Sequence, residues 1–193
     1  MATNSSVPTP SIHQQKWLAG SSLQIVSTTL LTIILLAFAV VVAAASGVEE
    51  VRMEDRCDAA TFPAEAGCIG HGGVTFAEFS AELNPHDGGH DAWKFNPHNT
   101  HIDAGETLRA VNIGGEPHSF TEVFNFGAGL VPPLNGALLP GTAPAVPVNP
   151  AGVAATFAGP GQSFEISGLS VGVHKFQCLI HPWMRTTVEV RTK

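Results

Sequence analysis

Three side chains able to bind a metal stand three residues apart near the end of the chain: a thiol at Cys178, an imidazole at His181 and a thioether at Met184. A loop between two strands can curl this spacing around a single ion. Soft sulfur donors combined with imidazole favour copper over magnesium, calcium or manganese, and zinc rarely uses methionine. The spacing therefore predicts a copper site in this loop.

A copper site of this kind needs one more strong donor, because a blue-copper centre has two His, one Cys and a long, weak bond to Met. The best candidate in the sequence is His118. It follows the turn-forming run Gly114-Gly115-Glu116-Pro117 and begins a predicted strand. A histidine in such a place can point along the end of a sandwich, toward a loop that joins two other strands.

The order His118, Cys178, His181, Met184 and the run Cys-x2-His-Pro-aromatic-Met-Arg resemble the cupredoxins, small blue-copper proteins such as plastocyanin and amicyanin. The resemblance covers residues 93–126 and 160–191, and the short ligand loop is especially similar to that of amicyanin. It implies a cupredoxin-like Greek-key β-sandwich with one type 1 copper ion. It also implies His118, Cys178 and His181 as equatorial ligands and Met184 as the weak axial ligand.

The resemblance implies a one-electron carrier rather than an enzyme. A trigonal His₂Cys frame with a weak Met lies between the geometries that Cu(I) and Cu(II) prefer, so little moves when an electron arrives. Apolar residues of the loop should keep water from the metal and raise its reduction potential. The ring edge of His181 is expected at the surface, in an apolar patch that redox partner proteins can approach.

The sequence also departs from the family pattern. The separation of 60 residues between His118 and Cys178 is larger than in small cupredoxins, because residues 127–161 form a Gly/Pro/Ala-rich insert. Ser119 follows the first histidine where plastocyanin has Asn, so the hydrogen bonds around the site are expected to differ. Residues 46–92 have no counterpart in the minimal domain.

Two other function classes fit the sequence less well. A copper carrier or buffer that handles the ion rather than electrons usually adds exposed Met or His clusters, and after residue 45 only Met53 and Met184 remain. An oxidase or nitrite reductase needs more copper, from His-x-His pairs and a Cys flanked by His. Here Gln177 and Leu179 flank Cys178, and the sequence has no His-x-His. We therefore predict no enzymatic activity.

The remaining histidines favour structural roles. A second, copper-loading site could use His86, His90, His98 and His101. Pro and Gly around His86 and His90 indicate a loop, however, and solvated loop histidines are the simpler interpretation. His174 lies on the same strand face as Phe176 and Cys178, so it could support the site or simply pack. We favour packing.

Short runs separated by Gly, Pro and Asn predict an all-β sandwich in residues 93–193. The predicted strands are residues 93–96, 98–103, 106–112, 118–124, 163–166, 172–178 and 185–191. In the last run Val188 and Val190 alternate with polar residues, which is typical of a half-buried strand. The proline-rich insert at 127–161 is expected to be a long surface excursion.

The segment 46–92 is predicted to be a lead-in with a disulfide and a short helix. Thr75 and Glu78 have the spacing of a capping box, and apolar residues follow at helical intervals: Phe76, Phe79 and Leu83. This helix should cover one end of the core. Cys57 and Cys68 enclose a ten-residue loop and are expected to pair in an oxidising compartment, which leaves Cys178 for the metal.

The first 45 residues are predicted to be a signal peptide or a membrane anchor. No charged residue occurs from Ile25 to Ala45, a length that can span a bilayer, and the run ends in small residues that signal peptidase accepts. Lys16 precedes the run and four acidic residues follow it closely, so the start of the chain should stay in the cytoplasm. Both readings export the rest of the chain to the periplasm or the exterior.

The charge distribution limits the partners. All 16 Asp and Glu residues follow residue 48, against a total of 9 Lys and Arg. An acidic surface repels phosphate backbones, which excludes nucleic acid. We expect a monomer that meets redox partner proteins, with possible attachment to the membrane through residues 25–45.

Overall fold

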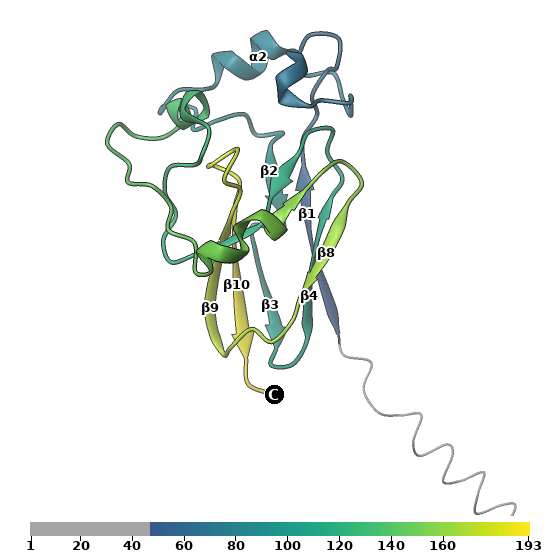
Figure 1. The fold of residues 1–193 in the computed structure, drawn as a ribbon, viewed down its shortest axis with the longest axis vertical. Coiled ribbons are helices and arrows are strands. Elements are labelled where there is room, and N and C mark those ends of the chain that lie inside the picture. The colour runs from purple at the N-terminus through teal and green to yellow at the C-terminus, as the bar shows by residue number, and fades with distance from the viewer. Residues whose placement is uncertain (1–46) are drawn as a thin grey trace, which may run out of the picture. The chain divides into compact units, whose positions relative to one another are not determined.

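The structure is a computed structural model and describes residues 47–193 (Figure 1). The predicted signal peptide or membrane anchor, residues 1–45, lies outside the described residues. From residue 47 onward, no helix has the length and apolar character needed to cross a membrane.

Two four-stranded sheets form the body of the described domain. The first has the order β2-β1-β4-β8, with bounds β1 Val48–Glu54, β2 Lys94–Asn96, β4 Thr107–Asn112 and β8 Ser163–Ile166. The second has the order β3-β10-β9-β6, with bounds β3 Asn99–Asp103, β6 Thr121–Val123, β9 Gly172–Gln177 and β10 Arg185–Arg191. A two-residue ladder joins β5, His118–Ser119, to β7, Phe157–Ala158.

The core lies between the two sheets, which confirms the predicted all-β sandwich. In β10, Val188 and Val190 are buried while Glu189 and Arg191 are exposed, as the alternation predicts. Aromatic rings fill the space between the sheets: Phe120 stacks on Phe176 with ring centroids 4.4 Å apart. Each predicted strand is present within one or two residues of its expected bounds, except that 118–124 is divided into β5 and β6.

Strand β1 was not predicted. It lies in residues 46–92, which the sequence assigned to a lead-in, yet it is an inner strand of the first sheet, parallel to β4 and antiparallel to β2. Val51 and Met53 are fully buried, and the same alternation continues to Asp55 and Cys57, both buried as well. The first part of the lead-in is therefore integral to the sandwich.

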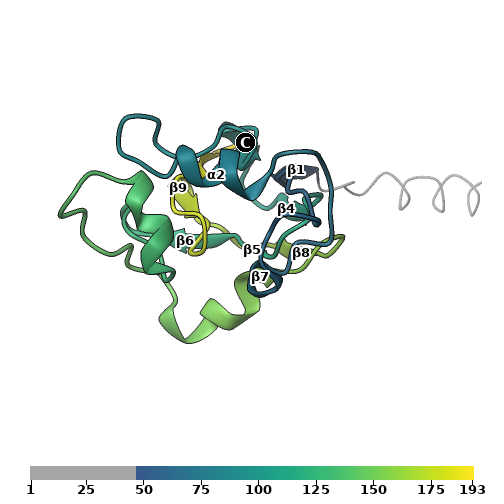
Figure 2. The ribbon, with the colours of Figure 1, turned by 90° about the horizontal axis from the view of Figure 1, so that it is seen from above.

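The rest of the lead-in covers one end of the sandwich. Helix α2, Phe76–Ala81, follows Thr75 and begins with the predicted capping box. The Thr75 side chain accepts the Glu78 N–H, and the Glu78 side chain accepts the Thr75 N–H. The predicted disulfide between Cys57 and Cys68 is present. Figures 1 and 2 show α2 at the end where a loop joins β9 to β10. The opposite end carries the C-terminus (Figure 1).

The insert contains two 3₁₀ helices, Pro132–Ala137 and Pro150–Thr156. It is more than a surface excursion, because its last residues form β7 and pair with β5, where Ala158 lies opposite His118. Its middle runs beside β6, with bridges that include Val123 to Pro147. The insert therefore closes the side of the sandwich next to the first predicted ligand.

Candidate metal centre

Three of the four predicted ligands meet in one buried pocket. His118 Nδ1 and His181 Nδ1 are 3.2 Å apart, and Cys178 Sγ lies 4.0 Å and 3.9 Å from them. His118 and Cys178 are fully buried, and His181 is 3% exposed. Among residues 47–193, this is the one group of three or more His, Cys, Asp or Glu donors arranged to hold an ion.

Strand ends place these donors. His118 is the first residue of β5, and Cys178 directly follows β9. The loop from Cys178 to Met184 is closed at its base, because the Cys178 N–H donates to the Met184 carbonyl over 3.0 Å. The Met184 N–H donates to the His181 carbonyl over 2.9 Å, which turns the loop and brings His181 back toward Cys178.

The sulfur of Cys178 accepts two backbone hydrogen bonds, from Ser119 and His181, each 3.4 Å long. Ser119 also ties the two halves of the site together, because its hydroxyl accepts the Leu179 N–H over 2.7 Å. A serine thus links the first-ligand strand to the ligand loop at the position where plastocyanin has Asn. Although burial raises the pKa of the Cys178 thiol, both histidines lower it more, and the pKa falls well below its usual value. The pocket favours the thiolate, which is the form that binds metals.

The outer nitrogen of His118 faces a buried carboxylate. His118 Nε2 lies 2.9 Å from Asp55 Oδ2, and both side chains are 0% exposed. Burial lowers the pKa of His118, but hydrogen bonds to Asp55 and Cys178 outweigh burial and raise it to about 9. Burial raises the pKa of Asp55, but hydrogen bonds from His118 and from the Glu116 N–H outweigh it, and the pKa is lowered.

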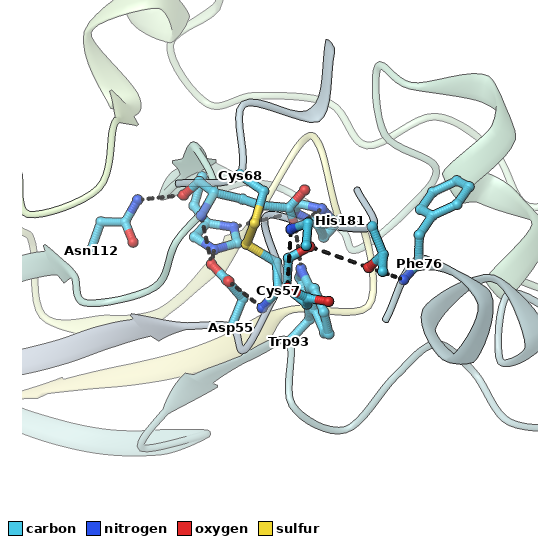
Figure 3. Close-up of a disulfide and its surroundings, with 12 residues drawn as sticks. Asp55, Cys57, Cys68, Phe76, Trp93, Asn112 and His181 are labelled. Carbon is cyan, nitrogen blue, oxygen red and sulfur yellow. Dashed lines mark hydrogen bonds and ion pairs between the residues drawn. A yellow bond between two sulfur atoms is a disulfide. The ribbon is translucent and has the colours of Figure 1, made fainter. Parts of the chain in front are cut away.

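His181 has a second carboxylate on its outer side. His181 Nε2 lies 3.6 Å from Glu116 Oε2, and the Trp93 indole N–H donates to the same oxygen over 2.6 Å. Burial raises the pKa of Glu116. Asn112 holds the turn that carries Glu116, because its side-chain amide donates to the Glu116 carbonyl over 2.8 Å. Figure 3 shows Asp55, Trp93 and His181 grouped near the Cys57–Cys68 disulfide.

The expected exposure of the His181 ring edge is wrong. Aromatic rings from α2, from the residue before β2 and from the ligand loop cover it, with centroids 6.3 Å away for Phe79, 6.5 Å for Trp93 and 5.5 Å for Trp183. Phe79 belongs to α2, and the backbone of Gly89 lies directly against the Trp183 indole. We call Phe79, Gly89, Trp93 and Trp183 the cap. Phe79 and Gly89 come from residues 46–92, which have no counterpart in the minimal domain, so the family resemblance did not indicate their part in the cap.

Met184 is fully buried beside Cys178 in the core cluster. Its backbone closes the ligand loop, and its role as a weak axial ligand stays a prediction. Leu179 and Pro182 of the same loop are buried too, which leaves an apolar rim around the pocket.

Within residues 47–193, the other histidines do not gather into a second site. His86, His98 and His101 are exposed, and His90 accepts the Ala92 N–H at its Nδ1. His174 bonds Glu122 over 2.6 Å and the Ser170 carbonyl over 2.8 Å, away from the three donors. Its role is to join β9 to β6, which agrees with the packing role favoured from the sequence.

The donor set fits a single copper ion. One thiolate and two imidazole nitrogens, with a thioether in the same loop, form the combination that selects copper. His118 Nδ1, His181 Nδ1 and Cys178 Sγ would hold the ion, because their separations of 3.2–4.0 Å allow all three to bind one ion. Carboxylates, like backbone carbonyls and water, are common partners for the outer nitrogen of a metal-binding histidine.

No protein-family model matches the chain, and no curated protein sequence matches it either. Among solved structures, a purple cupredoxin from Nitrosopumilus maritimus has 17% identity over 74% of this chain and 99% of that chain, with a TM-score of 0.38. An amicyanin variant in its Cu(I) form has 20% identity over 51% and 73%, with a TM-score of 0.31. A copper-containing nitrite reductase from Thermus scotoductus has 20% identity over 51% and 20%, with a TM-score of 0.32.

Likenesses at these TM-scores carry no functional argument, so the assignment rests on the chain's own residues. The two-sheet sandwich, the order of donors along the chain and their place at one end of the sheets are cupredoxin-like.

Proposed function

We propose that this chain is an exported copper protein that carries single electrons. The observation that carries the proposal is the pocket of His118, Cys178 and His181, whose three donor atoms are buried and lie within 4.8 Å of one another. The Cys57–Cys68 disulfide supports export, because such bonds persist in oxidising compartments.

The protein residues would hold the ion and limit its motion. His118 is fixed by Asp55, and the loop of Cys178 and His181 is fixed by its own backbone bonds and by Ser119. Copper would supply the one-electron couple when bound. Because these hydrogen bonds hold the ligand residues in place, a change of oxidation state would require little reorganisation of the protein.

The cover over the site supports a carrier rather than an enzyme. A catalytic metal needs a coordination position that a substrate can reach. Here all three donor residues are 3% exposed or less, and aromatic rings lie over His181. Electrons can tunnel through such a cover, whereas a substrate cannot pass it. The same cover opposes rapid exchange of the ion, which a copper buffer would need.

The test is to add one equivalent of Cu(II) to the purified full chain and record visible and EPR spectra. We expect an intense thiolate-to-copper band and a reversible one-electron wave in voltammetry. The band should vanish in Cys178→Ser and persist in His98→Gln, an exposed histidine control. A protein that binds copper without either signal, and gives it up quickly to a chelator, would instead be an ion buffer.

A further inference from the structure

Two buried carboxylates of the described domain lie behind the two ligand histidines. The side chain of Asp55 is 0% exposed and that of Glu116 is 4% exposed. Each faces the Nε2 of a ring whose Nδ1 faces the other donors. Burial of a carboxylate is costly unless hydrogen bonds or opposite charge compensate it. Two buried carboxylates beside one metal pocket therefore point to a function at that pocket.

Asp55 is held on both oxygens. Oδ2 accepts from His118 Nε2 and from the Glu116 N–H, each over 2.9 Å, and Oδ1 accepts the Cys57 N–H over 3.1 Å. With three donors in fixed places, the carboxylate cannot turn away from the ring. When the ring is neutral, a hydrogen on His118 Nε2 leaves Nδ1 bare, in the form that binds a metal.

Glu116 is held by the cap. The Trp93 indole N–H donates to Oε2 over 2.6 Å, and His181 Nε2 lies 3.6 Å from the same oxygen. Glu116 stands two residues before His118, so one turn supplies both a ligand and the carboxylate behind the other ligand. The cap therefore has two roles: it covers the ring of His181, and through Trp93 it fixes the Glu116 carboxylate that faces this ring.

We propose that Asp55 and Glu116 are positioning residues of the metal centre: Asp55 fixes the tautomer of His118, and both carboxylates favour the divalent over the monovalent ion. This inference rests on the proposed copper function. The attraction between a carboxylate and an ion scales with the ion's charge, and it is strong where water is excluded. Each carboxylate should therefore stabilise Cu(II) more than Cu(I) and lower the reduction potential.

The test compares reduction potentials of the copper-loaded full chain with those of Asp55→Asn and Glu116→Gln. Both substitutions keep the side-chain size and remove the charge. Glu122→Gln is the matched control, because Glu122 bonds His174 rather than a ligand histidine. We expect both site variants to shift the potential upward, by clearly more than the control does. Proton NMR of the Cu(I) protein should show the His118 Nε2 hydrogen shifted downfield by its bond to Asp55, and Asp55→Asn should reduce that shift.

The outcomes separate this inference from the proposed function. If the wild type shows no thiolate-to-copper band, the copper function fails and this inference with it. If the wild type shows the band and a reversible wave, but neither variant moves the potential more than Glu122→Gln does, only the positioning role is overturned. Should Asp55→Asn fail to fold, as seen in thermal unfolding without metal, Glu116→Gln decides the question.

Discussion

The backbone of Gly89 packs directly against the indole ring of Trp183. A Cβ added at Gly89 would overlap the indole, and the φ of +94° is one that other residues rarely adopt. Gly89→Ala should therefore displace Trp183, loosen the cap and speed the removal of copper by a chelator. Gly88→Ala is the control, because Gly88 has a similar φ of +74° and nothing within 4 Å of an added Cβ. Equal release rates in the two variants would show that the cap does not protect the metal.

The hydroxyl of Ser119 should matter for stability. In Ser119→Ala the buried Leu179 N–H loses its acceptor, which should lower the free energy of unfolding of the metal-free protein by about 1–3 kcal/mol. Ser163→Ala removes an exposed hydroxyl that accepts a hydrogen bond from Arg109. This control should change the free energy of unfolding by less than about 0.5 kcal/mol. Urea unfolding of both variants provides the comparison.

The disulfide should leave one thiol, that of Cys178. Thiol counting on the unfolded, metal-free chain should give one, and a count of three would refute the pairing. Replacing Cys57 and Cys68 together by Ala should lower the free energy of unfolding by about 3 kcal/mol, from the loop entropy that the bond removes in the unfolded chain. Urea unfolding under non-reducing conditions measures this loss.

The His174–Glu122 pair should make stability depend on pH. Burial lowers the pKa of His174, but hydrogen bonds to Glu122 and Ser170 outweigh burial and raise it above its ordinary 6.5. The folded state therefore binds this proton more tightly than the unfolded state does. The resulting stabilisation is complete below pH 6.5 and is lost as the pH rises through the folded pKa. The Tm difference between wild type and His174→Gln should thus be larger at pH 5.5 than at pH 9.

Met184→Leu tests the predicted axial ligand. The weak thioether donor stabilises Cu(II) more than Cu(I), so its loss should raise the reduction potential while the visible band persists. Spectroscopy and voltammetry of the copper-loaded variant give both quantities. If the variant lost copper altogether, Met184 would be a primary ligand and the trigonal arrangement would be wrong.

The parts of the molecule that were predictable are those set by local spacing. Cys178, His181 and Met184 lie in one short loop, so their chemistry is visible without the fold. The strand in which Val188 and Val190 alternate with polar residues, and the capping box at Thr75, are local patterns too. The structure places His118 with the loop ligands, as the resemblance implied.

What could not be predicted depends on register between distant segments. Met53 pairs with Asn112 in the parallel β1–β4 ladder, and this register carries Asp55 to the turn that precedes His118. Nothing in the local sequence sets that pairing, so neither carboxylate was singled out. The burial of Val51 and Met53 at alternate positions was the available signal for β1, but two glutamates at its start obscured it.

The parallel pairing of strands that are far apart in the sequence also affects how the protein folds. β1 pairs with β4, and β10 pairs with β3, so each sheet closes only when segments far apart in sequence meet. Such a topology has a high contact order, for which folding times of milliseconds to seconds are typical. The metal pocket needs β1, β5 and the loop before β10 together. We therefore expect the pocket to form only when these distant segments have come together, so that copper binds the folded domain rather than the unfolded chain.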